Sequence, residues 1–118
     1  MDMTSLAILR KRNEISQLVR ISNRHRNVLR WSPTESDVHL FMKLQICAYL
    51  RKQDTDFMTE AIFEKGEGRA DIIVLDQGIC IEVVESETEK SRLQKENKYP
   101  LPIIFVDAKA PFSEKLIQ

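Results

Sequence analysis

The sequence predicts a single α/β domain with a central mixed four-stranded sheet flanked by helices. Two hydrophobic segments, 69–75 and 79–84, are joined by a tight turn, which is typical of paired strands. A continuously apolar segment at 103–106 is typical of a strand covered on both faces. Segments with helical periodicity precede and separate these strands. A chain of 118 residues with 42% hydrophobic residues can bury one ordinary core.

Residues 5–29 are expected to be helical, because apolar residues recur roughly at helical spacing and neither glycine nor proline interrupts them. We expect residues 1–31 to form a basic helical extension of a core at 32–118. The extension holds seven Lys or Arg and two acidic residues, whereas the core holds eleven basic and sixteen acidic ones. This imbalance favours contact with nucleic acid; the alternative is an amphipathic helix that packs on a partner.

A second helix is expected from Pro33 to about Lys52. The segment Ser32-Pro-Thr-Glu35 has the pattern of a capping box, with Ser32 as the N-cap and Glu35 closing the box. The helix carries an apolar stripe that is broad enough to face a sheet. The stripe consists of Val38, Phe41, Leu44, Ile46, Cys47, Ala48 and Leu50.

The remaining elements follow from the same rules. Residues 57–63 alternate moderately and are expected to form the first strand. A second capping box, beginning at Ser86, opens a charged helix that runs to about Lys98. The strand at 103–106 and a short final helix at 112–117 complete the order helix, helix, strand, strand, strand, helix, strand, helix.

Each of the two central strands carries one carboxylate among apolar residues, Asp71 in the first and Glu82 in the second. A buried, unpaired carboxylate costs several kcal/mol, so such groups usually bind a metal, pair with a cation or do chemistry. A two-residue loop at Gln77-Gly78 pairs Ile73 with Glu82 and makes the two acids diagonal neighbours on one face. A three-residue loop puts them on opposite faces. We favour the first register because it brings both acids together.

Two carboxylates, one backbone carbonyl and several waters suit Mg²⁺ or Mn²⁺. Such an ion can activate water and stabilise the charge that develops on a phosphodiester. The alternative is that Asp71 and Glu82 form structural ion pairs with Arg69 or a lysine. His25 and His39 have no nucleophile or acid at useful spacing, so we expect ordinary surface or edge histidines.

The segments Gly68-Arg-Ala-Asp71 and Ile81-Glu-Val83, in this order of elements, resemble the PD-(D/E)XK nuclease superfamily over residues 33–106. They are similar to its "G-x-x-D" and "I-E-V-K" signatures. The resemblance implies a restriction-endonuclease-like fold with an extra N-terminal helix. It also implies that Asp71, Glu82 and the carbonyl of Val83 are metal ligands, and that Glu35 is a further metal-associated acid. The alternative role of Glu35 is the capping box.

One position departs from the superfamily pattern. The lysine expected two residues after Glu82 is replaced by Val84, which can neither position water nor neutralise charge. We expect Lys90, at the start of the following helix, to supply the catalytic cation, with Lys98 and Arg69 as further candidates. If no cation does so, the chain has lost cleavage and only binds.

The sequence therefore favours a metal-dependent nuclease that hydrolyses phosphodiester bonds of DNA and acts as a homodimer. Its small size favours a structure-specific enzyme of junction or repair type, or one from a mobile element. The alternative is a catalytically inactive module for nucleic-acid binding or protein assembly. The residues expected to contact nucleic acid are Arg10, Lys11, Arg12, Arg24, Arg26 and Arg69.

Two further features concern the compartment. Cys47 and Cys80 each lie in an apolar segment, so we expect reduced core thiols rather than a disulfide. No apolar run approaches the length of a membrane span, and the N-terminus lacks the pattern of a signal peptide. Both observations favour a cytoplasmic protein without a membrane partner.

Overall fold

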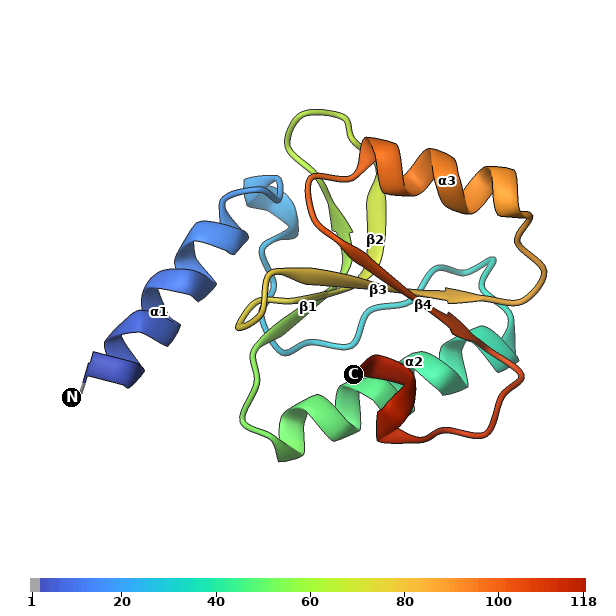
Figure 1. Ribbon diagram of the computed structural model, residues 1–118, viewed down its shortest axis with the longest axis horizontal. Helices are drawn as coiled ribbons and strands as arrows, with labels where there is room; N and C mark the ends of the chain where they lie inside the picture. The colour runs from blue at the N-terminus through green and yellow to red at the C-terminus, as the bar shows by residue number, and fades with distance from the viewer. Residues whose placement is uncertain (1–2) are drawn as a thin grey trace.

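The computed structural model describes residues 3–118 and has the predicted class, a mixed four-stranded sheet flanked by helices (Figure 1). The strands are β1 (Phe57–Ile62), β2 (Arg69–Val74), β3 (Ile79–Val84) and β4 (Ile103–Asp107). The helices are α1 (Met3–Ser16), α2 (Asp37–Lys52) and α3 (Glu89–Lys98), with two short 3₁₀ helices, η1 (Ile21–Asn23) and η2 (Glu114–Ile117).

The order of strands in the sheet is β1-β2-β3-β4. β1 pairs with β2, and β2 with β3, in the antiparallel direction, whereas β3 and β4 are parallel. Parallel neighbours need a crossover connection, and here α3 lies in that connection. This arrangement is compatible with a restriction-endonuclease-like fold.

The sheet separates two hydrophobic cores. The first lies against α2 and η2, where Met42, Ile46 and Leu50 pack on strand residues such as Ile72 and Ile81. The second lies on the opposite face, towards the segment after α3 and the end of α1. It consists of Ile15, Val19, Met58, Ala61, Phe63, Ala70, Ile73, Leu75 and Cys80. Both cysteines are buried free thiols, as predicted.

Both predicted capping boxes are wrong in position. α2 begins at Asp37, and its N-cap is Ser36, whose side chain accepts a hydrogen bond from the His39 N–H. Ser32 instead closes a turn, because its carbonyl accepts from the Glu35 N–H at 3.0 Å. α3 likewise begins two residues later than predicted, with Thr88 rather than Ser86 as its N-cap. Short polar side chains close to a helix start compete for the same role.

The apolar stripe predicted for α2 is only partly buried. Ile46, Cys47 and Leu50 face the sheet, whereas Phe41 and Leu44 are 61% and 47% exposed. The buried side instead contains Met42 and Lys43, along with the three predicted residues. With 3.6 residues per turn, a helix cannot turn all seven predicted positions towards one sheet.

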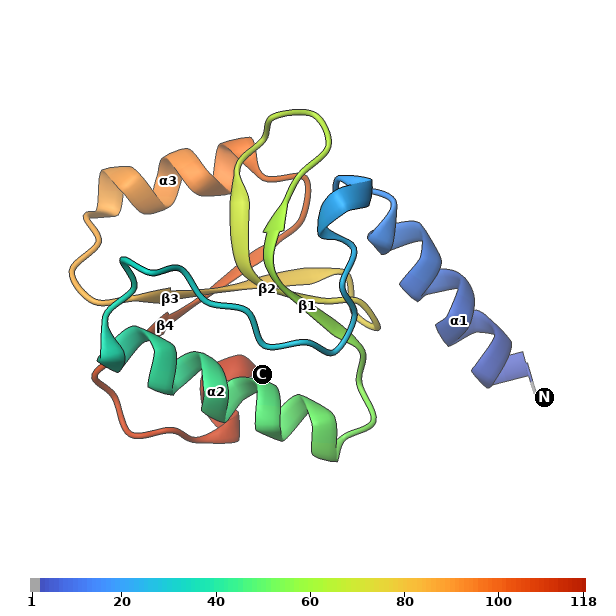
Figure 2. The ribbon, with the colours of Figure 1, turned by 180° about the vertical axis from the view of Figure 1, so that it is seen from behind.

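The single helix predicted over residues 5–29 is also wrong. α1 ends at Ser16, and the chain then runs along the outer edge of β1 (Figure 2). The Arg20 N–H donates to the Ile62 carbonyl at 2.9 Å, and the Asn27 N–H donates to the Phe57 carbonyl at 2.8 Å. Backbone groups at an edge strand need partners, and this segment supplies them.

α1 leads away from the sheet, with the N-terminus at its far end (Figures 1 and 2). Arg12 attaches this helix to the body of the protein. Its Nε and one terminal nitrogen donate to the two carboxylate oxygens of Asp76, at 2.8 and 2.9 Å. The same nitrogen donates to the Asp54 carbonyl at 3.0 Å. A bidentate pair of this kind is among the stronger polar contacts.

We expect Arg12→Gln to lower the free energy of unfolding by about 1–3 kcal/mol, because it breaks charge-assisted hydrogen bonds and leaves Asp76 without its cationic partner. Arg10→Gln is the matched control, since Arg10 is exposed on the same helix and should change stability by less than about 0.5 kcal/mol. Urea denaturation measures both values. Equal effects of the two substitutions would contradict the anchoring role of Arg12.

Candidate active site

The two predicted carboxylates meet between β2 and β3. The register pairs Ile72 with Ile81 and Val74 with Ile79, so the connecting loop has four residues rather than the predicted two. The shift is by an even number of residues and therefore preserves which side chains share a face. Continued along the strands, this register places Asp71 opposite Glu82 rather than diagonal to it.

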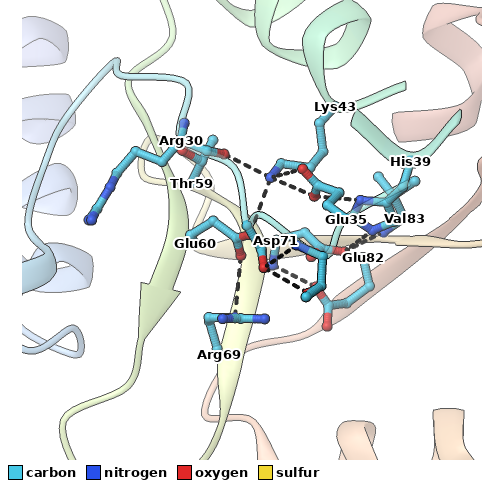
Figure 3. Close-up of polar contacts among 12 residues, drawn as sticks. Arg30, Glu35, His39, Lys43, Thr59, Glu60, Arg69, Asp71, Glu82 and Val83 are labelled. Carbon is cyan, nitrogen blue, oxygen red and sulfur yellow. Dashed lines mark hydrogen bonds and ion pairs between the residues drawn. The ribbon is translucent and has the colours of Figure 1, made fainter. Parts of the chain in front are cut away.

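The regular ladder of backbone hydrogen bonds between the strands ends at these acids. Beyond it, the two side chains accept hydrogen bonds from the backbone of the opposite strand. The Asp71 N–H donates to Glu82 Oε2 at 2.7 Å, and the Val83 N–H donates to Asp71 Oδ2 at 2.9 Å. Each carboxylate is thus held by the backbone of the other strand (Figure 3). The paired arrangement of Asp71 and Glu82 that the sequence predicted is present.

A strained residue lies on the other side of Asp71. In the register of β1 with β2, Glu60 falls between the pairs Thr59–Ile72 and Ala61–Ala70, opposite Asp71. Glu60 has φ +48°. A residue with a side chain rarely adopts a positive φ within a strand, and such strain is concentrated at functional sites.

His39 bridges two acids across the site (Figure 3). Its Nδ1 lies 2.6 Å from Glu35 Oε2, and its Nε2 lies 3.2 Å from Asp71 Oδ2. The hydrogen bond with Asp71 outweighs burial, and with the charges of both acids it raises the pKa of His39 to about 9. The protonated ring can therefore donate to both carboxylates at neutral pH.

The environment of Asp71 favours its charged form. Burial alone would raise its pKa, but the hydrogen bond and charge of His39, together with the Val83 N–H, lower the pKa below its ordinary value. Asp71 Oδ2 accepts from both of these donors. Its other oxygen, Oδ1, accepts no hydrogen bond from the part of the chain that the structure describes.

Lys43 is the second cation of this network. Its side chain is completely buried, and its Nζ donates to the Arg30 carbonyl at 2.9 Å and to Glu35 Oε2 at 3.0 Å. Glu60 Oε1 lies 3.5 Å from the same nitrogen. A buried ammonium is tolerated only with such partners. Lys43 therefore joins α2, β1 and the segment before α2 at one point.

Tyr99 holds the second carboxylate. Its hydroxyl lies 2.6 Å from Glu82 Oε1 and 2.7 Å from the Arg69 carbonyl, but it has only one proton to donate. Burial and then the charge of Asp71 raise the pKa of Glu82 to about 7, although the hydrogen bond with Tyr99 acts in the opposite direction. Tyr99 also requires Gly68, where an added Cβ would lie 2.8 Å from its ring.

The lysine beside the carboxylates is Lys95, which the sequence analysis did not select. Its Nζ lies 2.7 Å from Glu87 Oε1 and 3.5 Å from Glu82 Oε1. Lys90, the predicted catalytic cation, is exposed in the first turn of α3 and forms no ion pair with the described residues. Val84, where the superfamily has its lysine, is 6% exposed in the core.

Two hollows adjoin Asp71. The larger, of about 580 Å³, is lined by both predicted carboxylates together with cationic and glycine residues. The smaller, of about 240 Å³, lies on the side of Glu35, His39 and Glu60. A cavity of about 680 Å³ beside α2 is lined by neither carboxylate. The candidate site is therefore identified by the residues that line it and not by the volume of the cavity. The lining of the 580 Å³ cavity is Arg20, Ile62, Gly66, Gly68, Arg69, Asp71, Glu82, Lys95 and Tyr99.

Among the described residues, His39 and Lys43 engage the carboxylate oxygens of Glu35, which also lines the smaller hollow together with Asp71. Neither the helix cap nor direct contact with Asp71 is its role in the structure. Within residues 3–118, no three His, Cys, Asp or Glu side chains are arranged to hold a metal ion. A divalent ion here would rest on Asp71, Glu82, backbone oxygen and water.

The cations predicted to contact nucleic acid separate into three groups. Arg12, Arg24 and Arg26 are engaged by the protein itself: Arg24 donates to the Val19 carbonyl, and Arg26 donates to the Asn13 side chain. Arg10 and Lys11 are exposed on α1. Arg69 lines both hollows, and its Nε lies 3.3 Å from Glu60 Oε2.

Sequence reasoning did not select His39, Lys43, Glu60 or Tyr99 for the site, and it did not select Lys95 as the catalytic cation. One signal was available, because Glu35, His39 and Lys43 recur every four residues, the spacing at which side chains on a helix can meet. The expectation that His39 is an ordinary histidine is wrong. Glu60 and Tyr99 depend on strand pairing and on a long-range contact, neither of which leaves a local pattern.

The mixed sheet, its flanking helices and the paired acids between β2 and β3 define an α/β domain compatible with a restriction-endonuclease-like fold. Residues 35–100, more than half of the chain, match the family described as "Competence protein CoiA, nuclease-like domain". The chain belongs to this family, and the matched stretch contains both Asp71 and Glu82. No curated protein and no solved structure matches the chain. Among the described residues, no helix has the length and apolar character to cross a membrane.

We expect NMR titration of the His39 imidazole to give a pKa of about 9. Asp71→Asn should lower this pKa more than Glu35→Gln does, because the hydrogen bond with Asp71 is its largest cause. A folded pKa above the ordinary 6.5 means that protonation stabilises the fold below about pH 6.5 and that this contribution is lost as pH rises through about 9. An imidazole that titrates near 6.5 would contradict the bridge.

Proposed function

We propose that this chain is a metal-dependent nuclease that hydrolyses phosphodiester bonds of DNA. The main support for this proposal is the pair of carboxylates, Asp71 and Glu82. Each is hydrogen-bonded to the backbone of the other strand, and both line one cavity. Arg69 and Lys95 line the same cavity and supply positive charge for a phosphate. Membership of a family with a nuclease-like domain supports the same reading.

The donor set fits a hard divalent cation. Asp71 Oδ1 is free of hydrogen bonds from the described residues, and Glu82 lies beside it. Asp71, Glu82 and the Val83 carbonyl would hold Mg²⁺ or Mn²⁺, which prefer oxygen ligands and keep several waters. When bound, the ion supplies an activated water and stabilises charge on the phosphodiester.

The residues of the chain prepare this site for a phosphate. His39 keeps Asp71 ionised and fixes the position of its Oδ2. Tyr99 orients Glu82 by a hydrogen bond at 2.6 Å. Lys95, beside Glu82, takes the role of the superfamily lysine that Val84 cannot perform, because its ammonium can face the charge that develops on the phosphate.

The second candidate function is an inactive nuclease fold that binds nucleic acid or assembles with other chains. One observation favours it: Lys95 is also held by Glu87 at 2.7 Å, a partner that draws its ammonium away from a phosphate. Preference for junction or repair structures, an origin in a mobile element and homodimerisation remain predictions. Light scattering at several protein concentrations tests the homodimer.

We expect Asp71→Asn and Glu82→Gln each to abolish DNA cleavage in Mg²⁺ or Mn²⁺ while the protein stays folded, because each removes one of two candidate metal ligands. Glu114→Gln is the matched control, since Glu114 is an exposed acid in η2 that lines neither hollow beside Asp71. Gel assays of plasmid, linear and branched DNA, with and without EDTA, measure cleavage. Equal cleavage in EDTA would exclude the metal mechanism.

We expect Lys95→Ala to reduce the cleavage rate by at least about a hundredfold, the usual scale for a positioned charged group. Lys90→Ala should leave the rate within about threefold, because Lys90 is exposed on the same helix. The comparison decides between the two lysines: the opposite result would return the catalytic role to Lys90. Absence of cleavage on every DNA and RNA would favour the inactive module.

A further inference from the structure

One wall of the 580 Å³ cavity comes from a segment that the family match does not include. Arg20 lines this cavity together with Asp71 and Glu82, although it precedes residues 35–100. Its chain segment follows α1 and lies against the end of β1. Residues N-terminal to the matched region therefore contribute to the candidate active site.

The backbone at Arg20 is held firmly in place. The Arg20 N–H donates to the Ile62 carbonyl at 2.9 Å, and the Leu18 carbonyl accepts from the Glu64 N–H at 2.8 Å. Between these bonds, Val19 pairs with Phe63 in the antiparallel direction and is completely buried. The segment thus extends the sheet by a short stretch beside β1.

Side chains alternate in such an extended segment, so a buried Val19 is followed by a side chain that points outward. Arg20 is exposed, and its guanidinium forms no hydrogen bond or ion pair with any described residue. Arg12, Arg24 and Arg26, by contrast, donate to carboxylate, carbonyl or amide oxygens of the protein.

The charge of the cavity makes this free cation significant. Two carboxylates repel a phosphate, so a substrate strand needs positive charge along its path. Arg69 is paired with Glu60, and Lys95 is paired with Glu87. Of the three cations that line the cavity, Arg20 alone has no acid partner among the described residues.

We propose that Arg20 binds a phosphate of the nucleic-acid backbone next to the one at Asp71 and Glu82. A planar guanidinium presents two parallel N–H groups that match the oxygens of a phosphate. The substrate strand then runs from the carboxylates towards the outer edge of β1. This inference rests on the proposed function, and it assigns nucleic-acid contact to the segment after α1 rather than to α1 itself.

Fluorescence anisotropy with labelled single-stranded and duplex DNA tests the proposal, in EDTA so that cleavage does not interfere. Arg20→Gln should weaken binding about five- to tenfold and flatten the dependence of log affinity on log salt by about one unit. Arg20→Lys should retain the slope, because the charge remains. Arg10→Gln, on exposed α1, should change affinity less than about twofold.

The outcomes separate this inference from the proposed function. If the wild-type protein binds DNA and Arg20→Gln binds equally well with the same salt slope, the inference about Arg20 is wrong and the proposed function stands. If Arg10→Gln weakens binding and Arg20→Gln does not, α1 is the contact instead. If the wild-type protein binds neither DNA, the inference about Arg20 is overturned, and the cleavage assays in Mg²⁺ or Mn²⁺ decide the proposed function separately. Urea denaturation of Arg20→Gln shows whether the variant remains folded.

Discussion

The bridge that protonated His39 forms between Glu35 and Asp71 is the interaction on which the rest of the site depends. Its hydrogen bond with Asp71 favours the charged form of that carboxylate, and both Asp71 and Glu35 are largely removed from water. Lys43 repeats the arrangement between Glu35 and Glu60, so positive and negative groups alternate across α2, β1 and β2. Such a network is stable only when its members are satisfied together. Loss of one charge would leave its neighbours buried without compensation.

The fold supplies the geometry that this network needs. α2 begins after Glu35, so the Glu35 side chain is available to His39 and Lys43 instead of closing a helix cap. The ladder between β2 and β3 ends at the two acids, and their side chains bond to the opposite backbone. The positive φ of Glu60 lies at the same level of the sheet. The start of α2, the end of the β2–β3 ladder and the strained backbone of Glu60 therefore all lie close to Asp71.

The α/β class, the four strands and the pairing of Asp71 with Glu82 could be predicted from the sequence, because hydrophobic periodicity decides which strand faces are buried. The helix starts could not, since Ser32 and Ser36 are both good N-caps and only long-range contacts choose between them. In α3, which starts two residues later than predicted, Lys90 lies in the exposed first turn and Lys95 lies beside Glu82. The position of Arg20 could not be predicted either, because it depends on contact of its segment with the edge of β1, and such a contact leaves no local sequence pattern.

The segment that follows α1 has a consequence for how copies of this chain can associate. By bonding to the outer edge of β1, it removes one of the two edges at which the sheet could add a foreign strand. β4 is the other terminal strand of the sheet. Two copies joined through β4 would present only protected β1 edges at either end. Association of this kind would close as a pair with two-fold symmetry and could not propagate into a fibre.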